Sequence, residues 1–170
     1  MNRYLQGAYL FGIIGGVFCG LGFLVVYFLG HEPISFTEIF GYILIPIFVF
    51  LGIKNFKDNM NNGELTFGQG MTVGFFVYSI LAFISAIVIF IFLQVDSGIF
   101  NEFKASNLVL LREKKEILIA QLDKESYDTT FFNISNMTIF DVVFNDFLRK
   151  IFPGLFLTIL ISIILKRSND

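Results

Sequence analysis

The chain has 170 residues, of which 55% are hydrophobic and only 15% are charged, and its formal net charge is −2. Soluble domains contain about 45–50% apolar and about 25% charged residues, so this composition excludes an ordinary water-soluble fold. The small net charge and the scattered basic residues also exclude a basic surface for nucleic acid.

The first apolar run covers residues 4–30 and holds no ionisable group except tyrosines. It exceeds the roughly 20 residues that a helix needs to cross a bilayer, and it predicts a membrane-spanning helix at about residues 6–29. The run is too long for a secretory signal, and no Ala-x-Ala cleavage site follows it. We therefore expect this helix to stay in the membrane as an anchor.

A row of glycines, Gly12, Gly16 and Gly20, follows one face of this helix at four-residue intervals. Small residues let helices in a membrane approach closely. We expect this face to pack on another span of the same chain, with a homodimer contact as the alternative. Gly70 and Gly74, further along the chain, are predicted to form a second, weaker contact point.

The second span is predicted at about residues 38–55, and its uncharged part of about 15 residues is short for a bilayer. Glu38 at its start and Lys54 at its end are expected to anchor it at the two membrane interfaces. Ser35 and Glu38 have the spacing of a capping box, which predicts the start of the helix. Pro46 lies in the middle of the run and is expected to kink the helix.

A polar hairpin follows at residues 55–63, where Asn-Asn-Gly is typical of a turn. The third span is predicted at about residues 70–94, within an uncharged run that extends from 65 to 95.

Residues 96–147 form the only sizeable hydrophilic segment. Five of its apolar residues fall on one face about 100° wide if the segment is helical; they are Leu108, Leu111, Leu118, Ile119 and Leu122. Leu110 and Ile117 lie off this face. We therefore expect one or two amphipathic helices. Lys115 interrupts this face, so three roles stay open: docking on the membrane surface, packing on the spanning helices, and self-association.

The fourth span, predicted at about residues 148–166, is bracketed by basic pairs that are expected to anchor its two ends at the interfaces. These pairs are Arg149 with Lys150, and Lys166 with Arg167. Pro153, in the first membrane turn, is expected to bend the helix.

The residues before this span predict that its helix begins outside the bilayer. Thr138 and Asp141 have the spacing of a capping box. Asp146 and Lys150 are four residues apart, and we expect them to pair on an exposed part of the helix.

Four spans place both ends of the chain on one side of the membrane. Most basic residues outside the long hydrophilic segment share that side: Arg3, Lys54, Lys57, Lys166 and Arg167. The loop around His31 has no Lys or Arg, so the positive-inside rule predicts cytoplasmic N and C termini. The hydrophilic segment is itself rich in Lys and Arg, but its length of about 55 residues is near the limit where the rule loses force.

No catalytic group of residues is recognisable, and we expect no enzymatic activity, cofactor or metal. His31 and Cys19 are the only residues of their kinds, which excludes a disulfide within the chain and a histidine-rich zinc site. Ser85, Thr158 and Ser162 lie within predicted spans and are expected to hydrogen-bond between helices or to their own carbonyl groups.

Three stretches of the chain resemble the bacterial domain-of-unknown-function family numbered 4199. They run from Glu38 to Asp58, from Gly63 to Gly70 with Gly74 beyond, and from Ile161 to Arg167. The resemblance implies a four-span protein of the Gram-negative inner membrane with a hydrophilic segment before the last span. It implies no established activity, cofactor or catalytic residue.

Taken together, the sequence predicts an all-α, four-span membrane protein that forms a single domain over residues 1–170. The leading functional hypothesis is a non-enzymatic inner-membrane component that packs with itself or with another membrane protein. The glycine face and the amphipathic segment motivate it. The alternative is a small transporter or channel, which predicts a polar cavity around Pro46, Gln94 or Ser162.

Overall fold

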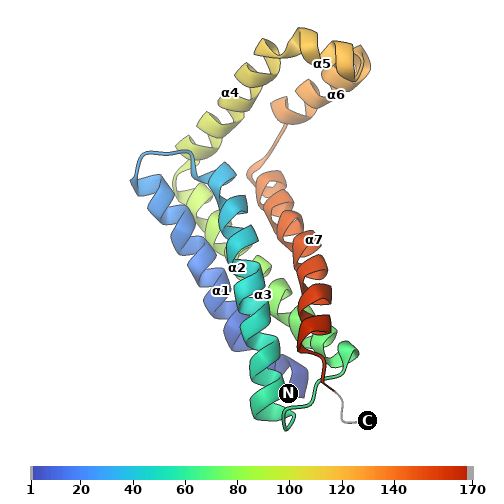
Figure 1. Cartoon of the computed structure of the whole chain (residues 1–170). Coiled ribbons are helices and arrows are strands. Elements are labelled where there is room, and N and C mark those ends of the chain that lie inside the picture. The colour runs from blue at the N-terminus through green and yellow to red at the C-terminus, as the bar shows by residue number, and fades with distance from the viewer. Residues whose placement is uncertain (1, 168–170) are drawn as a thin grey trace. The chain divides into compact units, whose positions relative to one another are not determined.

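The computed structural model describes residues 2–167, except for the side chain of Glu38 (Figure 1). The elements, in chain order, are α1 (Arg3–Phe28), α2 (Pro33–Asn55), the π-helical turn η1 (Phe56–Met60), α3 (Phe67–Val95), α4 (Ser97–Glu113), α5 (Lys115–Gln121), α6 (Lys124–Ser135) and α7 (Ile139–Leu165). Within the described range the only β-type pairing is an isolated bridge between Leu65 and Arg167. The predicted all-α fold class is confirmed.

Four helices are long and apolar enough to cross a membrane, and they confirm the four predicted spans. They are Arg3–Phe28, Pro33–Met60, Phe67–Val95 and Ile139–Leu165, with lengths of 26, 28, 29 and 27 residues. Every backbone group in hydrocarbon needs a partner within its own helix, which is why uncharged runs of this length are helical.

The chain divides into two compact units. The larger unit comprises Met1–Ile89 and Phe144–Asp170, and the smaller unit comprises Phe90–Val143. The larger unit therefore contains α1, α2 and most of α3 and α7, whereas the smaller unit contains α4, α5 and α6.

The start of α2 differs from the prediction. The helix begins at Pro33, and the carboxylate of Glu32 accepts hydrogen bonds from the amides of Ile34 at 2.5 Å and Ser35 at 3.1 Å. The predicted capping box beginning at Ser35 is wrong, because Glu32 supplies the acceptor earlier and the fixed φ of Pro33 suits the first helical position.

The start of α7 agrees with the prediction. The amide of Thr138 donates to Asp141 Oδ2 at 2.8 Å, and the amide of Asp141 donates to Thr138 Oγ1 at 3.3 Å. This reciprocal capping box starts the helix nine residues before the predicted span.

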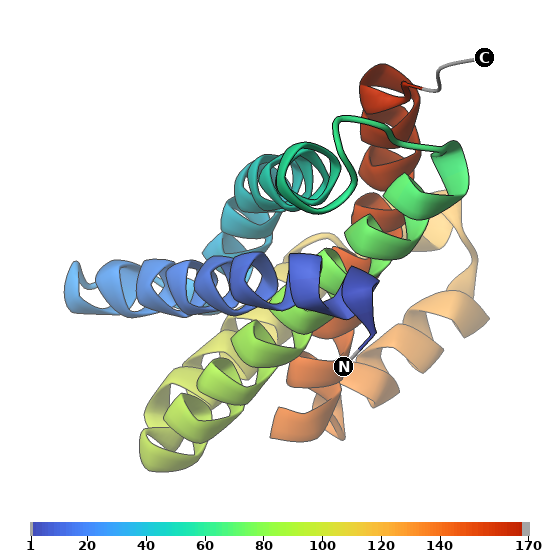
Figure 2. The same ribbon diagram turned by 90° about the horizontal axis from the view of Figure 1, so that it is seen from below.

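Three distant parts of the chain meet at one end of the larger unit. The Arg3 guanidinium donates to the carbonyl of Met60 at 2.7 Å and to Asn61 Oδ1 at 2.8 Å. Leu65 and Arg167 exchange two backbone hydrogen bonds of 2.7 and 2.9 Å. Figure 2 shows the hairpin beside the C-terminal end of α7. The hairpin turns as predicted, through left-handed backbone at Asn62 and Gly63.

The glycine row of α1 packs against α3 within the larger unit. A Cβ added at Gly12 would lie 2.7 Å from Ile80 Cβ, and one added at Gly20 would lie 2.7 Å from Val88 Cγ1. The three glycines therefore let the α1 backbone approach α3. The structure thus contains the expected packing of this face on another span of the same chain.

In the smaller unit, one side of α4 and α5 packs on α6. The predicted apolar face is half-buried at Leu108, Leu111, Leu118 and Ile119, but Leu122 is 60% exposed. Leu122 leaves that face because the chain turns at Asp123, where φ is positive. Asp123 is also the N-cap residue of α6. The segment thus forms three helices rather than one or two.

Cations and aromatic rings connect the helices of the smaller unit. Arg112 lies 5.5 Å from the ring centroid of Phe131, and Lys115 lies 5.6 Å from that of Tyr127. Lys115, which interrupts the apolar sequence pattern, therefore joins α5 to α6 through a cation–π contact. At the start of α6, the hydrogen bond from the Ser126 amide holds the pKa of Asp123 below its usual value.

Alanine at Gly16 tests the contact between α1 and α3. The added Cβ would lie 2.6 Å from Ile84 Cβ and 2.9 Å from the Leu81 carbonyl oxygen, and that backbone carbonyl cannot turn aside. We expect Gly16→Ala to lower the free energy of unfolding by about 1–3 kcal/mol, measured by denaturant unfolding in detergent with circular dichroism.

Gly68→Ala is the matched control, because a Cβ at Gly68 meets nothing within 4 Å. Alanine is favoured over glycine in helices by about 1 kcal/mol, so this variant should be at least as stable as the parent. Equal unfolding free energies for the two variants would contradict the packing.

Candidate functional site

Asp146 and Lys150 form an ion pair inside the larger unit. They lie one turn apart on α7, and Lys150 Nζ donates a hydrogen bond to Asp146 Oδ1. Only 2% of Lys150 and 7% of Asp146 is exposed. The predicted pairing is therefore present, but its predicted exposure is wrong. Lys150 turns into the bundle, where Asp146 compensates its charge, instead of reaching water as an interfacial anchor.

The pair lies well away from both ends of α7. Lys150 is 11 residues after Ile139 and 15 residues before Leu165. At 1.5 Å per residue, these separations correspond to about 16 and 22 Å.

Side chains and backbone from two further helices surround Lys150. A Cβ added at Gly41 of α2 would lie 3.2 Å from Lys150 Cε and 3.3 Å from Lys150 Cγ, so the lysine stem packs against bare backbone. The buried thiol of Cys19 on α1 is close enough to interact electrostatically with both Lys150 and Asp146. The ion pair is thus enclosed where α1, α2 and α7 meet.

The pair is part of a longer buried row on α7. Residues 146, 150, 154, 158 and 162 recur every fourth position, and all five are buried. They are Asp146, Lys150, Gly154, Thr158 and Ser162. We call these five residues the polar row. It extends over 16 residues, or about 24 Å of helix.

Residues of α3 pack against the last three residues of the polar row, Gly154, Thr158 and Ser162. Added Cβ atoms at Gly70 and Gly74 would lie 2.9 Å from Ser162 Cβ and 2.9 Å from Thr158 Oγ1, respectively. A Cβ at Gly154 would lie 2.6 Å from Tyr78 Cγ. Gly70 and Gly74 therefore do form a contact point, and their partner is α7.

The contacts between α3 and α7 have an antiparallel register. Gly70 lies beside Ser162, Gly74 beside Thr158 and Tyr78 beside Gly154. Ser85, further along α3, is fully buried.

The hydroxyl groups of the site lack hydrogen-bond partners. Ser85 Oγ, Thr158 Oγ1 and Ser162 Oγ are buried and have no partner among the described residues. The hydrogen bonds that we predicted for these side chains are therefore not formed. An unsatisfied buried hydroxyl costs about 1–3 kcal/mol, so packing alone does not account for three of them.

The whole polar row lies within one stretch that matches a protein family. The chain matches the family described as Protein of unknown function (DUF4199) over residues 10–167. The chain belongs to the DUF4199 family. No curated protein and no solved structure matches it. The match spans the four apolar helices almost completely, so this DUF4199 protein is a membrane protein of unknown activity.

The other predicted anchors of this DUF4199 protein whose side chains are described are exposed. Lys54 is in the last turn of α2, and Lys166 and Arg167 follow α7; all three are exposed. Arg149 is also exposed, and its Nε donates to Asn145 Oδ1 at 3.3 Å. The side chain of Glu38 lies outside the described part of the structure.

Both prolines that we expect to kink a helix lie inside that helix. Pro46 lies inside α2 and Pro153 lies inside α7, and the bends at these residues stay predictions. Among the described residues, no group of three or more His, Cys, Asp or Glu side chains is placed to hold a metal ion.

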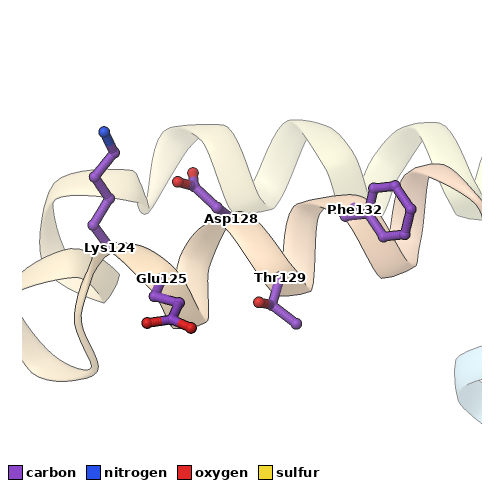
Figure 3. Close-up of a pocket in the computed structure, with 5 residues that line it drawn as sticks. All are labelled: Lys124, Glu125, Asp128, Thr129 and Phe132. Carbon is purple, nitrogen blue, oxygen red and sulfur yellow. The ribbon is translucent and has the colours of Figure 1, made fainter.

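An open depression of about 530 Å³ lies on α6 of the smaller unit. Figure 3 shows its lining side chains along that single helix: Lys124, Glu125, Asp128, Thr129 and Phe132. All five are exposed. The depression includes none of Pro46, Gln94 or Ser162, around which the transport alternative predicts a polar cavity.

Removing one or both charges tests the buried pair. Asp146→Leu or Lys150→Met leaves an unpaired buried charge, and each should lower the free energy of unfolding by about 3–5 kcal/mol. The double variant replaces both groups by apolar side chains and should lie close to the parent protein in stability. Denaturant unfolding in detergent supplies the four free energies.

Arg149→Met removes an exposed neighbouring charge as a control and should change stability by less than about 1 kcal/mol. If the losses in the two single variants simply add in the double variant, the side chains are not coupled.

Proposed function

We propose that this DUF4199 protein is a non-enzymatic component of the bacterial inner membrane that binds another membrane protein or a second copy of itself. The smaller helical unit is the partner-binding part. The glycine rows are poor candidates for this role, because α1 and α3 use them for contacts within the chain.

Exposed apolar side chains on the smaller unit carry this proposal. Ile117 on α5 is 59% exposed, Leu122 is 60% exposed, and Phe132 on α6 is 67% exposed. Val109 and Leu110 on α4 are also about half exposed. These residues lie outside the four candidate spans, and several neighbouring exposed apolar groups indicate an interaction surface.

The charge of the smaller unit favours a protein partner over a lipid surface. Residues 90–143 hold eight acidic and five basic side chains, which give a net charge of −3. Helices that bind anionic membrane surfaces carry an excess of Lys and Arg on their polar face. A partner protein with an apolar contact surface suits this composition better.

Site-specific photo-crosslinking in native membranes tests the proposal. A photoreactive residue at Ile117 or Phe132 should give a discrete protein adduct. Matched positions at Glu116 and Asp128, which are exposed polar residues on the same helices, should give little or none. An adduct of twice the 19.4 kDa mass identifies a second copy. Lipid adducts alone at Ile117 and Phe132 would overturn the proposal.

We further propose that both ends of the described chain face the cytoplasm. The gathering of Arg3, the hairpin and Arg167 at one end of the larger unit supports this orientation, because Lys54, Lys57 and Lys166 lie in the same segments. Short loops rich in Lys and Arg stay on the cytoplasmic side.

Cysteine accessibility tests the orientation. In a Cys19→Ala background, Lys115→Cys should react with a membrane-impermeant maleimide in intact spheroplasts, whereas Lys57→Cys should react only after permeabilisation. The opposite labelling pattern would show that the orientation is inverted.

Transport of an ion or small solute is the second candidate function, and the polar row supports it. Ionisable side chains inside a membrane bundle are rare and often belong to ion or proton pathways.

A further inference from the structure

We infer that the hairpin end of the larger unit binds anionic phospholipids through a group of cationic side chains. We call this group the cationic end, and its residues are Arg3, Lys54, Lys57, Lys166 and Arg167. Its ligand is the phosphate of a lipid headgroup that carries no positive charge of its own. This lipid site belongs to the larger unit, so it does not depend on the partner-binding role of α4, α5 and α6.

Contacts between distant segments bring the cations to one place. The guanidinium of Arg3 donates to the carbonyl of Met60 at 2.7 Å, and Lys57 lies in the same π-helical turn as Met60. On the other side of the hairpin, Leu65 exchanges two backbone hydrogen bonds with Arg167. The remaining two cations lie three residues before Lys57 and directly before Arg167. All five therefore surround the hairpin.

Hydrogen bonds within the hairpin hold its backbone in place. Asn61 Nδ2 donates to the carbonyl of Glu64 at 2.7 Å, and Gln69 Oε1 accepts from the amide of Thr66 at 2.9 Å. Leu65, between Glu64 and Thr66, is fully buried. A surface whose backbone is already ordered loses less conformational entropy when a ligand binds. The hairpin thus offers a preorganised support for the cations.

The cations outnumber the acidic side chains of the same segments. The hairpin holds two acidic residues, Asp58 and Glu64, against the five basic residues, so this end has a net charge of +3. Lys54, Lys166 and Arg167 are exposed. Within the described range 2–167, no hydrogen bond or ion pair engages the charged groups of these three side chains. The cationic end therefore attracts anions.

Exposed apolar side chains beside the cations favour a lipid over a soluble anion. Ile163 and Ile164 lie shortly before Lys166 on α7, and Leu51 lies one turn before Lys54 on α2; all three apolar side chains are exposed. They belong to candidate spans. A phospholipid matches both features, because its phosphate can meet the cations while its acyl chains lie along the apolar side chains. Clusters of about four to eight Lys and Arg beside the cytoplasmic end of a span are typical sites for anionic headgroups.

Native mass spectrometry of the full chain in detergent tests the lipid site. The protein is titrated with phosphatidylglycerol and, separately, with phosphatidylcholine that has the same acyl chains. Each Lys or Arg near an anionic headgroup contributes a factor of about five in binding. The wild type should therefore bind phosphatidylglycerol at least roughly tenfold more tightly than phosphatidylcholine. Lys54→Gln/Lys166→Gln should weaken phosphatidylglycerol binding roughly five- to tenfold and leave phosphatidylcholine binding unchanged.

Lys114→Gln/Lys124→Gln is the matched control. It also removes the charges of two exposed lysines, but both lie in the smaller unit. This variant should keep the preference of the wild type. Glutamine is a good helix former, and circular dichroism checks that both variants are folded. An excess of glycerol 1-phosphate, which has the phosphate but no acyl chains, should not displace the bound lipid.

Four results would overturn the lipid site. They are equal binding of the two lipids by the wild type, an unchanged preference in Lys54→Gln/Lys166→Gln, equal losses in the two double variants, and displacement of the lipid by glycerol 1-phosphate. The last result would assign the cationic end to a soluble phosphate instead. A loss confined to Lys54→Gln/Lys166→Gln supports the lipid site.

Discussion

Close approach of helices at glycine is the constraint on which the larger unit depends. Lipid tails are as apolar as leucine side chains, so helices in a bilayer gain little from apolar burial and associate through tight contacts instead. Gly12, Gly16 and Gly20 bring α1 against α3, while Gly70 and Gly74 bring α3 against α7. Helix α3 thus makes both contacts, with α1 and with α7.

This tight packing determines the chemistry of the polar row. Because Gly41 lets α2 approach so closely, the side chain of Lys150 is enclosed and must satisfy its charge locally. Asp146, one turn earlier on the same helix, supplies that partner. The burial of Lys150 therefore depends on the neighbouring helix α2, whereas its charge partner comes from α7 itself.

The spans were predictable from the sequence because they depend on local properties. Length and the absence of charge define them, and the capping box at Thr138 and Asp141 was equally readable. The start of α2 was missed since two competing caps lie close together, and Glu32 with Pro33 fits the first turn better than Ser35 does.

The site was only partly predictable, because side-chain burial depends on other helices. The sequence placed Asp146 beside Lys150, but it grouped Lys150 with Arg149 at an interface. Adjacent helical residues point about 100° apart, and only the positions of α1, α2 and α3 decide which of the two is covered. The four-residue recurrence from Asp146 to Ser162 was visible in the sequence and was the signal that we missed.

The contact between α3 and α7 also defines what kind of segment lies between them. These two helices are direct neighbours at Gly70, Gly74 and Gly154 although α4, α5 and α6 separate them along the chain. The intervening helices are therefore an insertion within a helical hairpin. The entropy of closing such a loop grows only slowly with its length. A longer or shorter insertion should therefore change the stability of the transmembrane scaffold only slightly.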